Sequence, residues 1–125
     1  MVILDTCAII EAFKPKPSFS KTTTNQITQG SYIMSVSFAE IACKVKLGKL
    51  EMSISTRALF KKISKVQNIN IIEIGVNEWL DSIELVWDDN RDPADRIITS
   101  FAIKNELSIV TTDKKIEKFY QKVIW

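Results

Sequence analysis

The sequence predicts an α/β fold of three layers, with helices on both faces of a central, mostly parallel sheet of about five short strands. Two observations predict it. Short continuous apolar runs alternate along the chain with longer segments in which apolar residues recur at helical spacing. The runs do not alternate between apolar and polar residues, which is typical of parallel strands buried on both faces. A chain of 125 residues fits one compact domain, so we expect residues 1–125 to fold as a unit.

The first predicted strand covers residues 2–4, and residues 6–13 are expected to form the first helix. Pro15 and Pro17 end this helix, because a proline keeps the residue before it out of the helical conformation. A polar helix is expected over residues 20–29. This part of the chain therefore predicts one strand and two helices.

The second predicted strand covers residues 32–34, and the helix after it covers residues 37–46. Gly48 is the expected stop of that helix, since glycine readily adopts the backbone conformation that follows a helix end. Residues 55–67 predict a basic amphipathic helix. Its apolar stripe consists of Leu59, Ile63 and Val66.

The second half of the chain continues the alternation. Strands are expected at residues 69–74, 107–110 and 123–124, and helices at residues 77–87 and 92–105, with a short helix before the last strand. The helix that begins near residue 92 has the clearest start, because Asp92 can cap it and Pro93 fits its first turn.

The composition excludes several kinds of active site. The chain has no histidine, which rules out Ser-His-Asp and Cys-His catalysis and zinc sites with imidazole ligands. Cys7 and Cys43 stand far apart in the sequence, so we interpret them as packing residues and expect no disulfide. We expect Trp79, Trp87 and Trp125 to be core or dimer contacts rather than base-stacking platforms. An enzyme of this composition must use carboxylates, lysines, hydroxyls or a metal.

The charge is unevenly distributed, and no targeting signal is evident. Residues 1–70 hold ten basic and four acidic side chains, whereas residues 71–125 hold seven and eleven. Such asymmetry suits a polyanion-binding face beside an acidic site, although charge alone favours an ordinary solvated surface. The first residues lack the basic region of a signal peptide, and no apolar run approaches the roughly 18 residues of a membrane span. We therefore expect a cytoplasmic protein.

Acidic residues are expected to gather at one edge of the sheet, outside the carboxyl ends of the strands, where open α/β sheets bind ligands. Asp5 lies at the carboxyl end of the first predicted strand, and Asp113 lies just past the end of the strand at residues 107–110. Glu40 lies in the first turns of the helix after the second strand. Asp95 lies in the first turn of the helix before the Asp113 strand. We expect a helix that runs antiparallel to the strands to start at the edge opposite to the strand ends, unless the chain first crosses back. The sequence therefore leaves the position of Asp95 open.

A cluster of these four carboxylates would be unstable by itself, because like charges in a desolvated pocket repel one another. A cation relieves the repulsion, and oxygen ligands without imidazole or paired thiolates favour Mg²⁺ or Mn²⁺. Each acid also has a structural alternative. Glu40 stands four residues before Lys44, the spacing of a surface ion pair, and Asp95 suits the dipole of its helix. The remaining candidates suit helix caps: Asp5, Asp92 and Asp113.

Four short motifs, in order along the chain, carry a resemblance to a known family. They are Ile3-Leu4-Asp5-Thr6, Ser35-Val36-Ser37-Phe38-Ala39-Glu40-Ile41, Asp92-Pro93-Ala94-Asp95-Arg96-Ile97-Ile98 and Val110-Thr111-Thr112-Asp113. With them the chain resembles PIN-domain ribonucleases, and more closely the toxin subunits of VapBC-type toxin–antitoxin pairs. The motifs span nearly the whole chain, which implies one PIN domain over residues 1–125. Asn90 departs from the histidine, and Ala39 from the large residue, that many relatives carry there.

The resemblance implies a role for each motif residue. It implies an acidic site for Mg²⁺ or Mn²⁺ that consists of Asp5, Glu40, Asp95 and Asp113. It implies accessory roles for Asp92, as a further acid or a helix cap, for Thr6 and Thr111, as hydrogen-bonding supports, and for Arg96, which would orient a carboxylate or contact phosphate.

The activity that this resemblance implies is metal-dependent hydrolysis of RNA, which leaves a 5′-phosphate and a 3′-hydroxyl. The metal would activate water and stabilise charge on the phosphate. Lys44, Lys46 and Lys49 are candidates for holding the RNA backbone. Toxins of this family usually pair as homodimers and are held inactive by an antitoxin.

Other functions fit the residues less well. An aspartyl-phosphate phosphatase needs a second acid two residues after its nucleophile, but Cys7 occupies that position. A receiver domain needs a phospho-acceptor after a central strand, and none follows residues 69–74. A non-catalytic PIN-like nucleic-acid-binding or interaction module would have a decayed site, and the presence of all four acids argues against decay.

Overall fold

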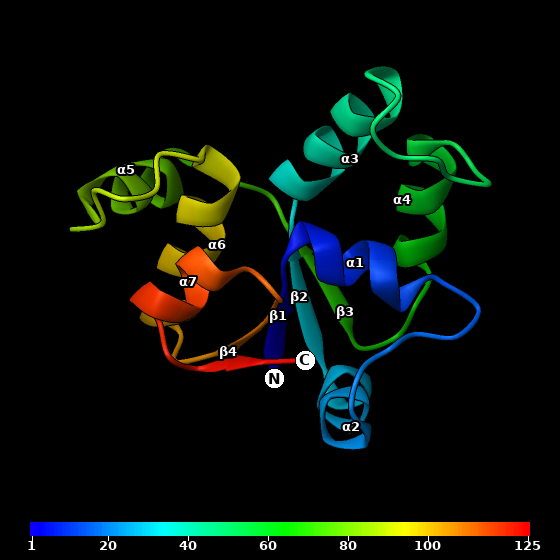
Figure 1. The fold of residues 1–125 in the computed structure, drawn as a ribbon, viewed down its shortest axis with the longest axis horizontal. Helices are drawn as coiled ribbons and strands as arrows, with labels where there is room; N and C mark the ends of the chain where they lie inside the picture. Colours follow the sequence, from blue (N-terminus) through cyan, green and yellow to red (C-terminus); the bar gives the residue numbers. More distant parts are fainter.

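The computed structural model describes residues 1–125 and contains one sheet of five strands in the order β3-β2-β1-β4-β5 (Figure 1). The strands are β1 (Val2–Leu4), β2 (Ser31–Met34), β3 (Ile69–Ile72), β4 (Ser108–Val110) and β5 (Val123–Ile124). Every neighbouring pair of strands is parallel. The predicted fold class is confirmed, and the sheet is entirely rather than mostly parallel.

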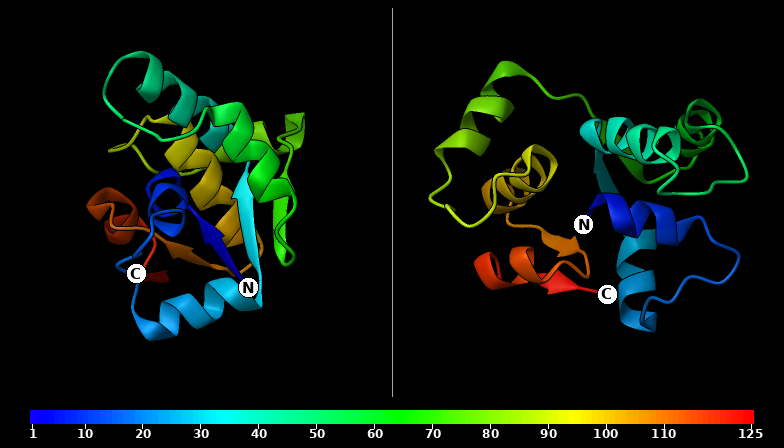
Figure 2. Two further views of the ribbon diagram at one scale, coloured as in Figure 1. Left: turned by 90° about the vertical axis from the view of Figure 1, so that its right-hand side faces the viewer. Right: turned by 45° about the horizontal axis from the view of Figure 1, so that its top comes forward.

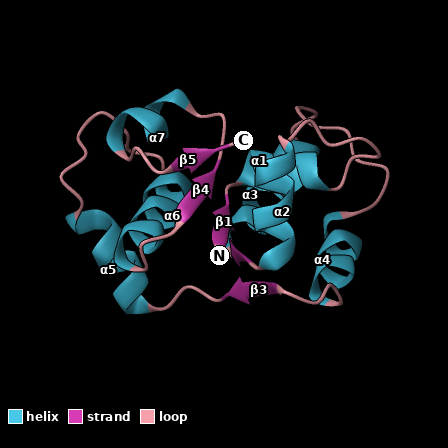
Figure 3. Cartoon of the chain, turned by 90° about the horizontal axis from the view of Figure 1, so that it is seen from below, coloured by secondary structure: helices cyan, strands magenta, loops and turns pink.

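Seven helices cover the two faces of this sheet, and Figure 3 shows the strands between the two groups of helices. The helices are α1 (Thr6–Ala12), α2 (Lys21–Gln29), α3 (Val36–Lys46), α4 (Thr56–Ser64), α5 (Val76–Glu84), α6 (Pro93–Lys104) and α7 (Lys114–Phe119). Two helices end earlier than predicted: α4 stops at Ser64, which leaves Val66 exposed, and α5 stops at Glu84, which leaves Trp87 in a loop. No helix has the length and apolar character that a membrane crossing requires.

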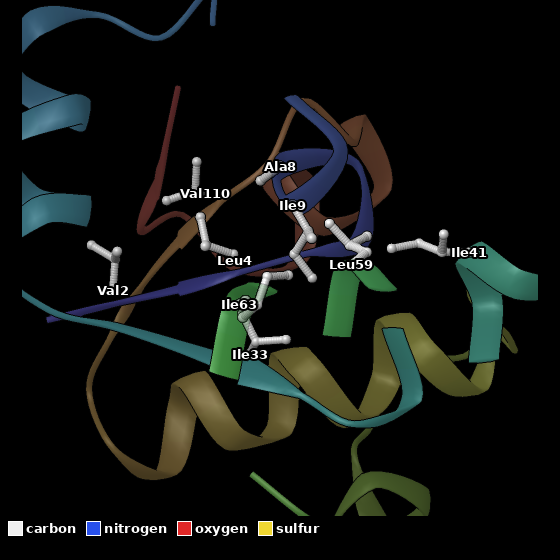
Figure 4. Packing of buried hydrophobic residues seen from close by; sticks show 9 residues of the cluster. All are labelled: Val2, Leu4, Ala8, Ile9, Ile33, Ile41, Leu59, Ile63 and Val110. Carbon is white, nitrogen blue, oxygen red and sulfur yellow. The ribbon is translucent and has the colours of Figure 1, made fainter. Parts of the chain in front are cut away.

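The short strands separate two hydrophobic cores, because successive side chains point to opposite faces of a sheet. Val2 and Leu4 enter one core, which also includes Ala8 and Ile9 of α1 and Leu59 of α4 (Figure 4). The second core lies on the opposite face. It contains Ile3, Met34, Trp87, Ile97, Ile98, Ala102, Leu107, Ile109 and Ile116. Burial on both faces explains why these strands are continuous apolar runs.

The strand ends and several helix starts lie at one edge of the molecule. Figure 2 shows α2 beside the N-terminus, at the edge opposite to the one from which α3 extends. Helix α1 follows the end of β1, α3 follows β2, and α7 follows β4. Helix α6 also begins at this edge, where Asp95 lines a pocket together with Asp5 and Asp113. The expectation that an antiparallel helix starts at the opposite edge was therefore wrong, because a helix that returns to the start of the next strand must begin where strands end.

Helix α5 has its apolar side turned outward. Ser82, on the side packed against the protein, is buried, and Asp81 on the same side forms an ion pair with Lys104 of α6 at 3.3 Å. The opposite side is apolar, and its residues are exposed: Val76, Trp79, Leu80 and Ile83, with exposed fractions between 40% and 73%. This outer stripe has helical spacing, but no part of the chain covers it.

Candidate active site

A pocket of about 220 Å³ at the carboxyl edge of the sheet gathers all four predicted site acids. We call it the acidic pocket. Its lining residues are Asp5, Thr6, Cys7, Glu40, Lys44, Asp95, Thr112 and Asp113. The four acids come from four separate segments, namely the start of α1, the second turn of α3, the first turn of α6 and the residue before α7.

Asp5 is the most deeply buried of these acids and is held at both carboxylate oxygens. As the N-cap of α1, its Oδ1 accepts a hydrogen bond from the backbone N–H of Ala8 at 2.8 Å and one from the thiol of Cys7 at 3.1 Å. Its Oδ2 accepts a hydrogen bond from the hydroxyl of Thr111. The helix-cap alternative for Asp5 is therefore correct, and it does not exclude a position in the pocket.

Thr111 links two of the acids. Its hydroxyl donates to Asp5 and accepts from the backbone N–H of Asp113 at 2.9 Å. Asp113 in turn caps α7, because its Oδ1 accepts from the backbone N–H of Lys115 at 2.8 Å and of Ile116 at 3.2 Å. The turn after β4 thus fixes Asp113 beside Asp5, and the other carboxylate oxygen of Asp113 is not used by the cap.

Asp95 is held by Asn90, the residue that stands where many relatives carry histidine. The side-chain amide of Asn90, which is buried, donates to Oδ2 of Asp95 at 2.9 Å. The amide oxygen of Asn90 also accepts the backbone N–H of Asp92 at 2.9 Å. Asp92 itself is exposed and caps α6 by accepting from the backbone N–H of Asp95 at 3.0 Å.

Glu40 lines the pocket from α3, together with Lys44 one turn later. The ion-pair alternative for these two residues is wrong. The ion pairs of the structure are Lys14–Glu11, Lys104–Asp81 and Lys114–Glu117. Thr6 supports the helix that carries Glu40, since its hydroxyl donates to the hydroxyl of Ser37 on α3 at 3.0 Å. Lys46 is the last residue of α3, and Lys49 follows the helix. Both are exposed, and neither lines the pocket.

Arg96 does not contact a carboxylate, contrary to the predicted role. Its buried guanidinium uses all five N–H donors on backbone carbonyls. We call these oxygens the carbonyl cage; they belong to Ser82, Ile83, Leu85, Trp87 and Asn90, at 2.6–3.3 Å. The cage joins the end of α5 and the loop that carries Asn90 to α6. Arg96 therefore fixes the position of Asn90, whose side chain in turn holds Asp95.

The electrostatics of the pocket reflect crowded negative charge. Burial, together with the neighbouring charges of Asp92, Asp113 and Glu40, raises the pKa of Asp95 from 3.8 to about 6, against a hydrogen bond from Asn90 that lowers it. Burial also raises the pKa of Asp5, against hydrogen bonds from Thr111 and Ala8 that lower it. Two acids of the pocket therefore resist ionisation, as a group of carboxylates does without a compensating cation.

The residue types in this pocket fit a hard divalent cation, although no three of them are arranged to coordinate one ion as they stand. Carboxylate oxygens from Asp5, Glu40, Asp95 and Asp113 line one small cavity, and they are the ligands that Mg²⁺ and Mn²⁺ prefer. Burial is the main cause of the raised pKa values of Asp5 and Asp95, and a cation bound among these acids would favour their ionised forms.

The interpretation of both cysteines as packing residues was wrong. Cys7 lines the acidic pocket, where its thiol bonds to Asp5 and lies 3.7 Å from the hydroxyl of Thr112. Burial and the charge of Asp5 raise the pKa of this thiol to about 11, so it acts as a hydrogen-bond donor. Cys43 is exposed on α3. The position of Cys7, two residues after the first acid, is the sequence signal that could have identified it.

Comparison with protein families gives one match, which covers most of the chain. The family model of the PIN domain matches residues 2–122. A search of curated proteins finds no significant match.

Several solved structures have folds similar to that of this chain. One is a toxin–antitoxin complex from Klebsiella pneumoniae, with a TM-score of 0.70 and 18% identity, covering 100% of this chain and 97% of that one. Another is FitAB bound to an IR36 DNA fragment, with a TM-score of 0.64, 16% identity and coverage of 100% and 94%. A third, FitAcB from Neisseria gonorrhoeae, has a TM-score of 0.58, 16% identity and coverage of 100% and 97%. At these identities the likeness concerns the fold.

Proposed function

Because this chain belongs to the PIN domain family, we propose that it is a metal-dependent endoribonuclease and the toxin of a VapBC-type toxin–antitoxin pair. The observation that carries this proposal is the acidic pocket, where carboxylates from four separate segments converge outside the carboxyl ends of β1 and β4. A structural role alone does not require such convergence, since each helix cap is satisfied locally.

Asp5, Asp95, Asp113 and Glu40 would hold Mg²⁺ or Mn²⁺ in this pocket. The bound metal would supply an activated water near neutral pH and stabilise charge on the phosphate. The protein fixes the ligands beforehand: Thr111 orients Asp5, the cap of α7 orients Asp113, and Asn90 orients Asp95.

The remaining pocket residues would hold the substrate. Lys44 is the one cation that lines the acidic pocket, and its ammonium group suits a phosphate of the RNA backbone. Lys46 and Lys49 extend the positive charge along the surface beyond α3. The chain has no histidine, so proton transfer in this proposal relies on carboxylates and water.

We propose two protein partners, a cognate antitoxin and a second copy of this chain, in the cytoplasm. The similar structure from Klebsiella pneumoniae is a toxin–antitoxin complex, which supports the first partner. The outward apolar stripe of α5 supports the second, because exposed apolar stripes of this size usually mark protein interfaces.

Incubation of the purified chain with single-stranded RNA tests the activity. We expect cleavage with Mg²⁺ or Mn²⁺, none with a chelator, and a loss of more than about 100-fold in Asp5→Asn. Asp88→Asn is the matched control, since Asp88 is an exposed acid that does not line the pocket. Metal-independent cleavage, or equal cleavage by Asp5→Asn, would contradict the proposal and favour a non-catalytic binding module.

A further inference from the structure

The carboxyl edge holds a second pocket, which adjoins the acidic pocket. We call it the edge pocket; its volume is about 440 Å³, and Thr112 lines both cavities. Its residues come from the end of β4, from α7 and from the last strand: Thr111, Thr112, Lys114, Glu117, Val123, Ile124 and Trp125. A chemical group in the edge pocket would therefore be the next neighbour of a group held by the acids.

The fold brings Trp125 to this position. Strand β5 is the outer neighbour of β4, and the backbone N–H of Thr111 donates to the carbonyl of Ile124 at 3.1 Å. Trp125 follows directly at the end of β5, as Asp113 follows β4. The aromatic side chain and the acids thus lie along the same edge of one parallel sheet.

The indole of Trp125 is held in one orientation. Its Nε1 donates to the hydroxyl of Ser18 at 3.2 Å, and its ring packs edge-on against Phe19 at 4.7 Å between centroids. The carbonyl of Trp125 accepts the backbone N–H of Ser20 at 3.3 Å. An aromatic wall that is fixed before a ligand arrives loses little entropy on binding.

The polar side of the edge pocket suits an uncharged heterocycle better than a phosphate. Lys114 and Glu117 form an ion pair at 3.1 Å, which balances the charge there, and both side chains are exposed enough to turn toward a ligand. Thr112 adds a hydroxyl that donates or accepts. A cavity lined by an aromatic side chain and by hydrogen-bonding groups is the way in which proteins hold unstacked bases of single-stranded RNA.

We propose that the edge pocket is a nucleobase subsite, which holds the base of the nucleotide next to the scissile phosphate. The inference rests on the proposed ribonuclease function and specifies its substrate as single-stranded RNA. This gives Trp125 a base-stacking role, whereas the sequence favoured a core or dimer contact for it. Stacking on Trp125 accepts every base, so the subsite positions the strand across the acids without reading a long sequence.

Binding without cleavage tests the subsite. We would measure the affinity of the full-length chain for a labelled single-stranded RNA hexamer in chelator, by fluorescence anisotropy. Removing one base at a time from the hexamer should reveal a position at which the abasic RNA binds about tenfold more weakly. This measurement uses the native protein, so it does not depend on whether a variant folds.

Trp125→Leu should reproduce this tenfold loss with intact RNA and should remove any further penalty for the abasic position. Phe101→Leu is the matched control, because Phe101 forms an edge-on pair with Tyr32 at the same interplanar angle of 67°, outside the edge pocket. Lys114→Gln tests the polar wall from a highly exposed position and should weaken binding by a smaller factor.

The outcomes separate the two proposals. If the native chain cleaves no RNA with Mg²⁺ or Mn²⁺, the proposed function fails. If it cleaves RNA but no abasic position couples to Trp125→Leu, the subsite is overturned and the ribonuclease proposal stands. Equal losses in Trp125→Leu and Phe101→Leu would likewise overturn the subsite, because they would indicate a general loss of stability.

Discussion

The acidic pocket and the carbonyl cage both contain buried charge. Helix α6 contributes adjacent residues to them, Asp95 to the pocket and Arg96 to the cage. Arg96 is surrounded by five carbonyl oxygens that match its five N–H donors. Asp95 faces other carboxylates and one amide, and its pKa is raised to about 6 by burial and by those negative neighbours. The guanidinium is balanced by the carbonyl dipoles around it, whereas the buried carboxylates repel one another. The cage therefore serves stability, and the pocket is suited to binding.

Replacement of Arg96, the cation of the carbonyl cage, should have the largest effect on the stability of the fold. Arg96→Met leaves five carbonyls without donors, three of them from buried hydrogen bonds, so we expect it to lower the free energy of unfolding by about 3 to 5 kcal/mol. Arg96→Lys keeps the charge but has fewer donors and should lose less. Urea denaturation followed by circular dichroism measures both, and a loss below 1 kcal/mol in Arg96→Met would contradict the structural role of the cage.

Supplying a cation to the pocket should have the next largest effect. Mn²⁺ at about 100 times its dissociation constant should stabilise the native chain by about 2.7 kcal/mol, because it binds only the folded protein. Thermal unfolding at increasing Mn²⁺ concentration measures the gain. Asp5→Asn should lose most of it, while Asp88→Asn, outside the pocket, should keep it; an equal gain in both variants would argue against this site.

Removal of the hydrogen bond that orients one ligand should lower the affinity for the metal to a smaller extent. Asn90→Ala removes the amide that orients Asp95, and loss of such a supporting hydrogen bond typically costs about tenfold in metal affinity. Titration calorimetry with Mn²⁺ compares this variant with Asn77→Ala, which changes an exposed asparagine of α5. Unchanged affinity in Asn90→Ala would show that Asp95 is oriented without its amide partner.

The smallest expected effect is on the pH dependence of stability in metal-free protein. The pKa of Asp95 is raised on folding, so between about pH 4 and pH 6 the folded state keeps a proton that the unfolded state loses. The free energy of unfolding should therefore fall as pH rises through this window, by less than the full shift predicts because solvent reaches Asp95. Urea midpoints across this range should be flatter in Asp95→Asn than in the native chain.

Asp5, Glu40 and Asp113 were predictable as residues of one sheet edge, because each follows a short apolar run that forms a strand. The position of Asp95 was left open, and it lies in the acidic pocket because α6 begins at the same edge. The role of Arg96 was not predictable. Its partners are backbone carbonyls at the end of α5 and in the loop after it, and carbonyl groups carry no signature in the sequence. The interpretation of Asn90 was limited in the same way, since its contact with Asp95 depends on the path of the loop that the cage fixes.

The outward stripe of α5 could also not be read from the sequence. Val76, Leu80 and Ile83 have the spacing of an ordinary amphipathic helix, and that spacing predicts which residues share a face. It does not say whether the face meets the core of the same chain or another molecule. The structure decides this, because the inner side of α5 is occupied by Ser82 and by Asp81 paired with Lys104.

The central position of β1 has a consequence for the timing of folding during synthesis. Leu4 pairs with Val110, so the first strand gains its second neighbour only after more than a hundred further residues have left the ribosome. Asp5 and Asp113 meet at the same late stage. Such long-range parallel pairing forms slowly, and the nascent chain therefore cannot assemble the acidic pocket until almost all of these residues have been translated.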